Sequence, residues 1–489
     1  METYVNHLYV TGRRESAHSG ARLGITNPAT EEEFGSIADA DDTDVDVAVR
    51  AARTALTSDA WRSLTAAARA DLLHNLATVL DRRADEFVEA LLPQNGFPVT
   101  MQRLHVMGAA NLYRYYADVV RTYEFEELRT YRGSNTIVRK EPVGVAGLIA
   151  PWNGPQPLAA FKIAPALAAG CTVVLKPAPQ TSLDAFLLAD AVAEAGFPPG
   201  VFNVITGGAA TGAALVAHPG VRKVAFTGST AAGRAIAQAC AADFKPVTLE
   251  LGGKSAAILL EDADMELFAA KAARLCAPET GQVCFSHTRV LAPRARYDET
   301  VQAVTAALAA TVTGDPRKED TTMGPLISQA QRERVEQYIA LGREQGGRVV
   351  LGGGRPTGLD RGYYLEPTVF DQVDNNMRIA RDEIFGPVVA VIPYGSEAEA
   401  IAIANDSDYG LAGCVFSQDV EHALQVARKI ETGSIGVNMY GTSHAAPFGG
   451  VKASGMGREL GPEGLTAYLA YKAIYGAPDD AALAPAALA

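Results

Sequence analysis

The sequence predicts an α/β protein built on a doubly wound parallel sheet, and three observations carry that prediction. Between Val143 and Gly253, five short apolar runs alternate with longer segments of helical periodicity. Glycine or proline joins these segments. The alternation continues, less regularly, after Gly253. Short strands that alternate with helices are typical of a parallel, doubly wound sheet.

The elements of this sheet are expected in a definite order. The strands fall within residues 143–150, 171–179, 200–207, 221–228 and 245–253. The helices fall within residues 158–170, 181–196, 212–220 and 229–240, the second with Thr181 as its N-cap and Gly196 as its stop. Such sheets bind ligands at the carboxyl ends of their strands. Side chains that follow each strand are therefore the first candidates for a site.

The flanking regions contain further elements. Residues 41–56 and 70–92 have the apolar spacing of amphipathic helices packed on a core. After Gly253, the pattern predicts a second α/β domain. Its helices are expected in residues 265–275, 396–406 and 419–430, and its strands in residues 288–293 and 386–394. Residues 464–475 are expected to form a final strand.

Composition and charge narrow the class of protein. The 489 residues, 48% hydrophobic and 20% charged, fit a soluble protein of two or three domains. No apolar run approaches the roughly 20 residues of a membrane helix, and the N-terminus does not resemble a signal peptide. The net charge of −13 and the lack of a basic tract argue against nucleic acid or an anionic membrane as a partner.

The five cysteines predict neither disulfides nor a metal site. They are Cys171, Cys240, Cys276, Cys284 and Cys414. Their number is odd, and none stands in a C-x-x-C pair or near a histidine in metal-ligand spacing. We therefore expect no metal, and a reducing cytoplasm suits this pattern best.

A glycine-containing turn follows the fourth predicted strand. Gly228 and Gly233 lie at the start of a helix, with Ser229 between them. The free N–H groups of a helix N-terminus can bind an anion such as pyrophosphate, and the serine can add a hydroxyl. The spacing differs from the usual G-x-G-x-x-G pattern, and a tight strand–helix turn explains these residues about as well.

Three polar residues follow other strands of the same sheet. Lys176 can pair with a ribose hydroxyl or phosphate, although a surface lysine is the alternative. Glu250 can act as a general base on water, or form an ordinary salt bridge. Asn153 can donate its amide N–H to an oxyanion, or serve as a turn residue between prolines. All three are expected at one edge of one sheet.

Cys284 is the candidate nucleophile. A lone cysteine is more often a small buried apolar residue. Here, however, a base, an oxyanion donor and a dinucleotide site accompany it, and together they suit one reaction. A thiolate adds to an aldehyde, hydride leaves to a nicotinamide, and water cleaves the resulting thioester.

Over nearly its whole length the chain resembles the aldehyde dehydrogenase superfamily. The segments that carry the resemblance are PWNGP, LKPAPQT, FTGSTAAG, LELGGKS, GQVC, DEIFGPV, NDSDYGLAG and PFGGVKASGMGREL, in the order of the family. The resemblance implies oxidation of an aldehyde to its carboxylate with NAD or NADP and water.

The resemblance also implies roles for individual residues. Cys284 matches the nucleophile, Glu250 the base for deacylation, and Asn153 the oxyanion donor together with the backbone N–H of Cys284. The implied cofactor-binding residues are Ile149, Trp152, Lys176, Gly208, Gly228, Ser229, Gly233, Glu383 and Phe385. Glu383 matches the acceptor for the nicotinamide-side ribose, with Phe385 against the nicotinamide.

The family resemblance implies three parts in the chain. Residues 1–120 and 143–250 would form the cofactor-binding domain, and residues 251–450 the catalytic domain. Residues 121–142 and 466–489 would form an oligomerisation flap and C-terminal tail. We therefore expect a homodimer or homotetramer.

Two positions depart from the family pattern. Many relatives carry glutamate where Pro179 stands, and its loss removes an acceptor for the adenosine ribose and a repulsion against a 2′-phosphate. NAD stays favoured, with NADP as the alternative. Gly154 replaces a large apolar residue and would open the substrate tunnel, which favours a bulky or aromatic aldehyde. The expected tunnel residues are Gly154, Gln156, Phe161, Phe285, Ser443, His444 and Phe448.

Two other functions compete with this interpretation. A CoA-acylating semialdehyde dehydrogenase has the same fold but lacks the glutamate in the LELGGKS-like segment. A structural protein derived from the family tends to lose the nucleophile or the base, and both are present here.

Overall fold

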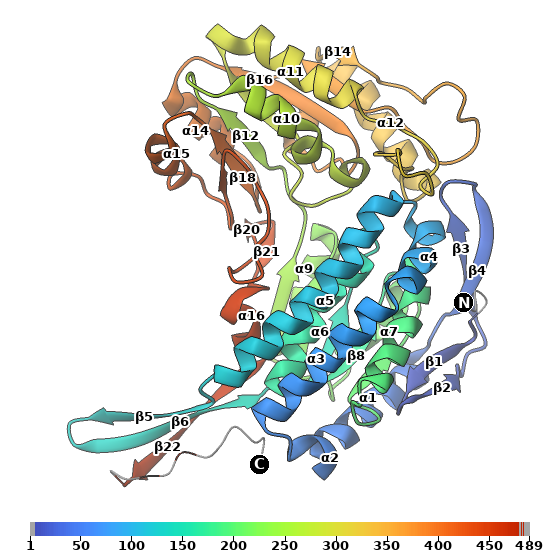
Figure 1. Ribbon diagram of the computed structural model, residues 1–489, viewed down its shortest axis with the longest axis vertical. Helices are drawn as coiled ribbons and strands as arrows, with labels where there is room; N and C mark the ends of the chain where they lie inside the picture. The colour runs from blue at the N-terminus through green and yellow to red at the C-terminus, as the bar shows by residue number, and fades with distance from the viewer. Residues whose placement is uncertain (1–4, 479–480, 482, 484–489) are drawn as a thin grey trace.

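The computed structural model describes residues 5–478 together with 481 and 483. The chain forms two α/β lobes and a long β arm that extends from the first lobe (Figure 1). Each lobe is built around its own sheet. The described chain begins beside the first lobe, and its last strand, β22 (Leu469–Ala477), ends in the arm (Figure 1). Cys284 lines a cleft where the two lobes meet.

The sheet of the first lobe has eight strands in the order β2-β1-β9-β8-β7-β10-β11-β21. Strands β9, β8, β7, β10 and β11 run in parallel, so the chain order reverses between β7 and β10. Ligands bind at such a reversal. The strands span His7–Val10 (β1), Arg13–Ser16 (β2), Val145–Ile149 (β7), Thr172–Lys176 (β8), Phe202–Val204 (β9), Lys223–Thr227 (β10), Val247–Glu250 (β11) and Gly455–Met456 (β21).

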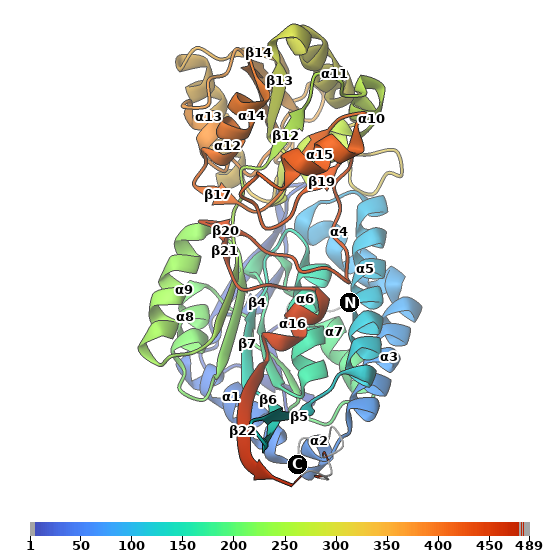
Figure 2. The ribbon, with the colours of Figure 1, turned by 90° about the vertical axis from the view of Figure 1, so that its left-hand side faces the viewer.

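Helices cover both faces of this sheet (Figure 2). Helices α3, α5, α6 and α7 pack on one face, and α1, α8 and α9 pack on the other. The helices span Asp42–Thr57 (α1), Asp59–Arg62 (α2), Ala66–Arg82 (α3), Ala84–Asn95 (α4), Val99–Thr122 (α5), Pro155–Ala169 (α6), Leu183–Glu194 (α7), Ala209–Ala217 (α8) and Thr230–Ala242 (α9).

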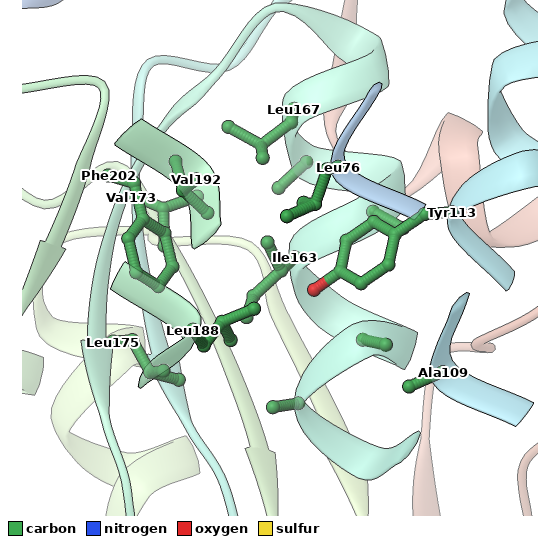
Figure 3. Packing of buried hydrophobic residues seen from close by; sticks show 14 of the residues in the cluster. Leu76, Ala109, Tyr113, Ile163, Leu167, Val173, Leu175, Leu188, Val192 and Phe202 are labelled. Carbon is green, nitrogen blue, oxygen red and sulfur yellow. The ribbon is translucent and has the colours of Figure 1, made fainter. Parts of the chain in front are cut away.

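The larger core of the first lobe lies between α6 and its neighbours. In Figure 3, Leu167 and Ile163 of α6 face Leu76, Tyr113 and Leu188 from three other helices. Helix α6 is apolar on nearly every side, because it is enclosed between the sheet and the outer helices. This enclosure holds the first turn of α6, which directly follows β7, in a fixed place.

The second lobe has a seven-stranded sheet in the order β14-β15-β16-β13-β12-β18-β19. All its pairs are parallel except β14 with β15. Its strands span Ala256–Leu259 (β12), Arg289–Pro293 (β13), Arg348–Leu351 (β14), Thr368–Asp371 (β15), Val388–Tyr394 (β16), Gly413–Phe416 (β18) and Gly436–Val437 (β19). Its helices span Met265–Cys276 (α10), Tyr297–Ala309 (α11), Gln329–Glu344 (α12), Arg378–Arg381 (α13), Glu397–Asn405 (α14) and Val420–Ala427 (α15).

The arm is a three-stranded antiparallel sheet in the order β22-β6-β5. It joins β5 (Glu126–Tyr131) and β6 (Ser134–Pro142) to the distant β22 (Leu469–Ala477). Two short pairs complete the structure, β3 (Arg22–Asn27) with β4 (Glu32–Ala38) and β17 (Tyr409–Gly410) with β20 (Val451–Lys452).

The expected α/β fold with a parallel, doubly wound sheet is confirmed, and three local expectations are corrected. The helix expected over residues 70–92 is interrupted at Arg83, where α3 ends and α4 begins. The N-cap of α7 is Ser182 rather than Thr181, which belongs to a preceding 3₁₀ turn. Residues 464–475 are not one strand, because helix α16 (Gly461–Thr466) occupies the start of that segment.

Two features of the chain ends and helices complete the description. Most of the alanine-rich tail from residue 477 onward lies outside the described residues. Among the residues that the structure does describe, no helix is both long and apolar enough to cross a membrane.

The enclosure of α6 predicts a large cost for truncating its core side chains. Leu167→Ala removes a fully buried side chain, so the free energy of unfolding should fall by about 2–5 kcal/mol in urea titrations. Leu424→Ala, at a side chain that is 36% exposed, should change it by only about 0.5 kcal/mol. Equal losses for the two variants would contradict this packing.

Candidate active site

A cleft of about 610 Å³ lies between the lobes, at the carboxyl ends of the first sheet's strands. The first lobe contributes the segments after β7 and β10, and the second lobe contributes the nucleophile loop and the segment before β16. Seven residues expected from the sequence line this cleft: Trp152, Asn153, Gly228, Ser229, Cys284, Glu383 and Phe385. The structure therefore brings together groups that are up to 233 positions apart, from Trp152 to Phe385.

Cys284 lies in the loop between the 3₁₀ turn Pro278–Gly281 and strand β13. It is the partly exposed member of five free cysteines, and the other four are buried. Burial raises the pKa of the Cys284 thiol, and the nearby carboxylates of Glu383 and Glu250 raise it further. In this environment the thiol keeps its proton until a base or a positive charge favours the thiolate.

Asn153 follows β7 and precedes α6. Its side chain is buried, and its Nδ2 donates a hydrogen bond of 2.8 Å to the carbonyl oxygen of Gln282. The amide has two N–H groups, so one bond sets its orientation and leaves a second donor. Gln282 stands two positions before Cys284, so the second N–H of the amide is held beside the loop of Cys284, where it suits an oxyanion.

Glu250 ends strand β11 and is 2% exposed. Neither of its carboxylate oxygens has a hydrogen-bond partner among the described residues. Burial raises the pKa of Glu250 well above its usual value, and the carboxylate of Glu459 adds to the rise. The cations of Lys162 and Arg458 oppose this rise. A buried carboxyl with open acceptor positions is suited to bind and deprotonate a water.

Lys162 and Glu459 form a buried ion pair beside Glu250. The Nζ of Lys162 donates to Glu459 Oε1 at 2.7 Å and to Thr227 Oγ1 at 2.5 Å. Both side chains are almost fully enclosed. This pair connects α6 to the end of β10 and to the segment that carries Phe448, so the surroundings of Glu250 are rigidly held.

The turn after β10 has the form of an anion site. Ser229 is the N-cap of α9, and its Oγ accepts from the N–H of Ala232 at 3.3 Å. A Cβ at Gly233 would stand 2.5 Å from Leu251, so only glycine allows this close approach of helix and strand. The first turn of α9, at Thr230 and Ala231, faces the cleft, where helix N–H groups favour negative charge.

Lys176, Ile149 and Gly208 gather at the neighbouring strand ends. Lys176 is buried, its stem packs beside Gly212, and its Nζ donates to the carbonyl of Pro177 at 3.1 Å. Burial lowers the pKa of Lys176 to about 8, while the Asp39 carboxylate favours the charged form. The N–H of Gly208 donates to Asp39 Oδ1 at 2.9 Å, and Ile149 also lies beside Gly212.

Glu383 and an aromatic pair close the other end of the cleft. Glu383 Oε1 accepts from the N–H of Gly253 at 3.1 Å, and burial raises the pKa of this carboxyl to about 7. The ring of Phe385 stands perpendicular to that of Trp152, with centroids 5.5 Å apart. Phe385 has a positive φ of 61°, a conformation that strains a non-glycine residue and that is typical of functional sites.

Aromatic side chains collect on the far side of Cys284. The rings of Phe161 and Phe448 lie 6.2 Å apart, and Phe285 lies 5.3 Å from Tyr440. His444, in the exposed loop that also holds Ser443, lies 6.4 Å from Tyr115. Four of the expected tunnel residues therefore belong to aromatic pairs: Phe161, Phe285, His444 and Phe448.

Two expected tunnel residues are placed differently. Gln156 is buried and donates to the Asp184 carboxylate, so its amide lies in the interface between α6 and α7 rather than beside the aromatic rings. Gly154 does not leave an open space, because a Cβ there would stand 3.2 Å from the side chain of Leu158. The sequence could not reveal the placement of Gln156, since it depends on which face of α6 meets α7, whereas the contact at Gly154 is local to the first turn of α6.

Several cleft residues were missed in the sequence. Arg234, Gln331, Arg334 and Tyr409 all line the cleft. Arg334 Nη2 donates to the carbonyl of Glu383 at 2.7 Å. Arg234, Gln331 and Arg334 are ordinary polar residues of helices, and no local pattern distinguishes them, whereas Tyr409 lies within the segment NDSDYGLAG that carries the resemblance.

The residues present fit a dinucleotide. The cleft is lined by the N-terminus of α9, by two arginines, by the carboxyl of Glu383 and by the rings of Trp152 and Phe385. Two glycines, Gly233 and Gly252, are required by contacts in the site itself, since a Cβ at Gly252 would stand 2.2 Å from Glu383 Oε2. These features agree with binding of pyrophosphate, ribose and an aromatic ring along one groove.

Comparison with known proteins agrees with this geometry. The model of the aldehyde dehydrogenase family matches residues 15–474. A geranial dehydrogenase of Castellaniella defragrans is 50% identical over 471 residues, which are 96% of this chain and 98% of that protein. A 3-succinoylsemialdehyde-pyridine dehydrogenase of a Pseudomonas species is 43% identical, over 96% of this chain and 98% of that protein.

Solved structures agree as well. The Mycobacterium tuberculosis aldehyde dehydrogenase in complex with NAD⁺ superposes with a TM-score of 0.96 at 45% identity, covering 99% of this chain and 100% of that one. A cysteine-to-alanine mutant of Pseudomonas syringae aldehyde dehydrogenase C, in complex with NAD⁺ and octanal, gives a TM-score of 0.94 at 41% identity, covering 97% and 98%. The resemblance noted in the sequence is thus confirmed: the chain belongs to the aldehyde dehydrogenase family and is an NAD(P)-dependent aldehyde dehydrogenase.

Proposed function

We propose that this enzyme oxidises a bulky apolar aldehyde to its carboxylate, with water as the acyl acceptor and Cys284 as the nucleophile. The observation that carries the proposal is the arrangement around one cleft. The Cys284 thiol and the Asn153 amide line this cleft, and the buried carboxyl of Glu250, with both oxygens unpartnered among the described residues, lies close enough to raise the pKa of that thiol.

The first steps use Cys284 and Asn153. The Cys284 sulfur attacks the carbonyl carbon of the aldehyde, and the carbonyl oxygen gains negative charge. The free N–H of the Asn153 amide stabilises this oxyanion, since the other is held by Gln282. A nicotinamide bound in the cleft would supply the acceptor for the hydride that leaves the former aldehyde carbon. The acyl group is then a thioester on Cys284.

Glu250 completes the reaction. Its carboxylate takes a proton from a water, whose oxygen attacks the thioester carbon and releases the Cys284 thiolate. The sum is aldehyde, NAD(P)⁺ and water giving carboxylate, NAD(P)H and two protons. A CoA-acylating enzyme would need no such base, so the buried, unpartnered Glu250 supports water.

NAD is the favoured cofactor. The solved relatives described above hold NAD⁺. Lys176, at the end of β8, and Glu383, in the lining of the cleft, each suit a ribose hydroxyl, which supports this proposal. Pro179 provides no carboxylate beside Lys176 and so does not repel a 2′-phosphate, which keeps NADP as the alternative.

Three further assignments belong to this proposal. The first lobe would form the cofactor domain, and the second lobe the catalytic domain. The arm would pair subunits of a homo-oligomer, because Tyr471 and Tyr475 of β22 are 62% and 81% exposed. The five free cysteines suit a reducing compartment such as the cytoplasm.

Glu250→Gln should separate the two halves of the reaction. The variant should release about one equivalent of NADH per site in a rapid burst, after which turnover should be slower by roughly 100- to 10,000-fold, because the water loses its base. Stopped-flow absorbance of NADH measures both phases. Cys284→Ala should show neither phase. A Glu250→Gln enzyme that turns over like the wild type would refute the role of Glu250.

Thioester hydrolysis should also depend on pH. Burial raises the pKa of Glu250, so the carboxylate that acts as base is lost at a higher pH than for an exposed glutamate. The single-turnover rate of acyl release should therefore rise with pH through a value well above the usual glutamate pKa. The residual hydrolysis of Glu250→Gln should lack this rise. A wild-type rate of acyl release that is independent of pH across this range would contradict the role of Glu250 as the base.

The aromatic pairs Phe161–Phe448 and Phe285–Tyr440 predict the substrate preference. The wild-type kcat/KM should increase by about fourfold per methylene along a series of linear aldehydes, as buried CH₂ groups contribute about 0.8 kcal/mol each. Citral, an isoprenoid aldehyde, should also exceed acetaldehyde. Phe448→Ala should weaken this trend, and Phe244→Ala, at a side chain that is 92% exposed, should not. Preference for acetaldehyde would rule out a bulky substrate.

A further inference from the structure

An unusual turn precedes the nucleophile. Glu279 (φ 50°, ψ 46°) and Thr280 (φ 62°, ψ 30°) both adopt left-handed backbone conformations, and Gly281 follows with a φ of 70°. L-residues with side chains rarely occupy this region, and two in succession are rarer still. Such a turn persists only where surrounding contacts hold it.

Specific contacts hold each residue of this turn. Glu279 Oε1 lies 2.9 Å from Nε2 of His105, and both side chains are nearly enclosed, at 12% and 13% exposure. The Oγ1 of Thr280 donates to the carbonyl of Gly324 at 3.0 Å. At Gly281 a Cβ would stand 2.2 Å from the carbonyl oxygen of Gly386, so no side chain fits there.

The contact between His105 and Glu279 crosses the lobes. His105 belongs to α5, in the helical layer of the first lobe, and its ring packs edge-on against Phe97 at 6.3 Å. Glu279 belongs to the second lobe, directly after α10. The contact between His105 and Glu279 therefore connects the two lobes, and it involves the side chain of a strained residue.

The turn sets the positions of the Asn153 amide and the Cys284 thiol. Gln282 comes next, and its carbonyl oxygen accepts the 2.8 Å bond from Asn153 Nδ2. The side chain of Gln282 is fixed as well, since its Oε1 accepts from the N–H of Ile327 at 2.9 Å. Cys284 follows two residues later. A relaxation of Glu279 to an ordinary backbone conformation would displace Gln282, and with it Asn153 and Cys284.

We propose that His105 and Glu279 are positioning residues, whose contact across the lobes holds the left-handed turn 279–281 and thereby keeps the Cys284 thiol and the Asn153 amide at the spacing that thiol addition requires. The inference rests on the proposed function and extends it to two residues that touch neither aldehyde nor cofactor. Small errors in such spacing reduce rates strongly while affecting binding little.

The experiment compares His105→Ala with His105→Gln and with a distant control. His105→Ala removes the partner of Glu279 and should lower kcat at least about tenfold. The KM for aldehyde and the Kd for NAD⁺ should change less than about threefold. His105→Gln keeps an N–H donor of similar reach and should recover most of kcat. His422→Ala breaks a surface pair with Glu397 (2.6 Å) and should leave kcat unchanged.

A second readout follows the thiol directly. Iodoacetamide alkylation of Cys284, measured by mass spectrometry of its peptide, should be slowed or accelerated at least about threefold by His105→Ala and restored by His105→Gln. This reaction requires neither aldehyde nor cofactor. A wild-type enzyme without dehydrogenase activity would therefore refute the proposed function while the alkylation rates still test the positioning role.

A double variant tests whether the His105–Glu279 contact acts by holding the strained turn, because it relieves the strain at residue 279. Asparagine tolerates the left-handed conformation better than glutamate. Glu279→Asn, added to His105→Ala, should therefore regain at least half of the lost kcat. Wild-type kcat and alkylation in His105→Ala would overturn the proposal. So would a loss that neither His105→Gln nor Glu279→Asn restores, or a loss explained by a lower Tm.

Discussion

Beside Cys284, a hydrogen bond from the side-chain amide of Asn153 to the carbonyl oxygen of Gln282 connects the two lobes. The donor follows the central strand of the first sheet, and the acceptor belongs to the loop of the nucleophile. Both groups are buried, so loss of this bond would leave a carbonyl without a partner in a water-poor environment. The geometry of thiol, oxyanion donor and cleft therefore depends on how the two lobes are docked.

Burial also determines the charge of the site. The same desolvation raises the pKa values of Glu250, Glu383 and Cys284 and lowers that of Lys176. Each shift favours the neutral form, because an interior solvates charge less well than water does. Two of these groups, Glu383 with a pKa of about 7 and Lys176 with a pKa of about 8, can take or release a proton near neutral pH, as is typical of functional sites.

The fold connects these two features. Helix α6 carries Lys162 into the interior, where it neutralises Glu459 and reduces the repulsion that Glu250 experiences. Helix α5 contributes His105 to the nucleophile loop of the other lobe. The outer helices of the first lobe thus do more than cover the sheet. Their packing determines both the electrostatic surroundings of the base and the position of the thiol.

Much of this protein was determined locally by its sequence. Alternating apolar periodicity predicted the parallel sheet, since strand and helix patterns arise from nearby residues. The short segments around Asn153, Glu250 and Cys284 predicted the site, because the ends of parallel strands must meet at one edge. The errors arose where a local pattern was uninformative. The apolar spacing continues through Arg83, where the helix breaks, and residues 464–475 suit a strand although their first residues are helical.

Only the tertiary structure decided which distant side chains meet. Gln156 turned toward Asp184, Arg334 reached the cleft, and His105 paired with a residue 174 positions away. None of these contacts has a periodic or motif signature, because the first depends on how two helices of one lobe pack and the other two depend on how the lobes dock. The sequence determined the candidate reacting groups of this enzyme, and the packing of its two lobes decided their burial, the direction of their pKa shifts and the strained turn before Cys284.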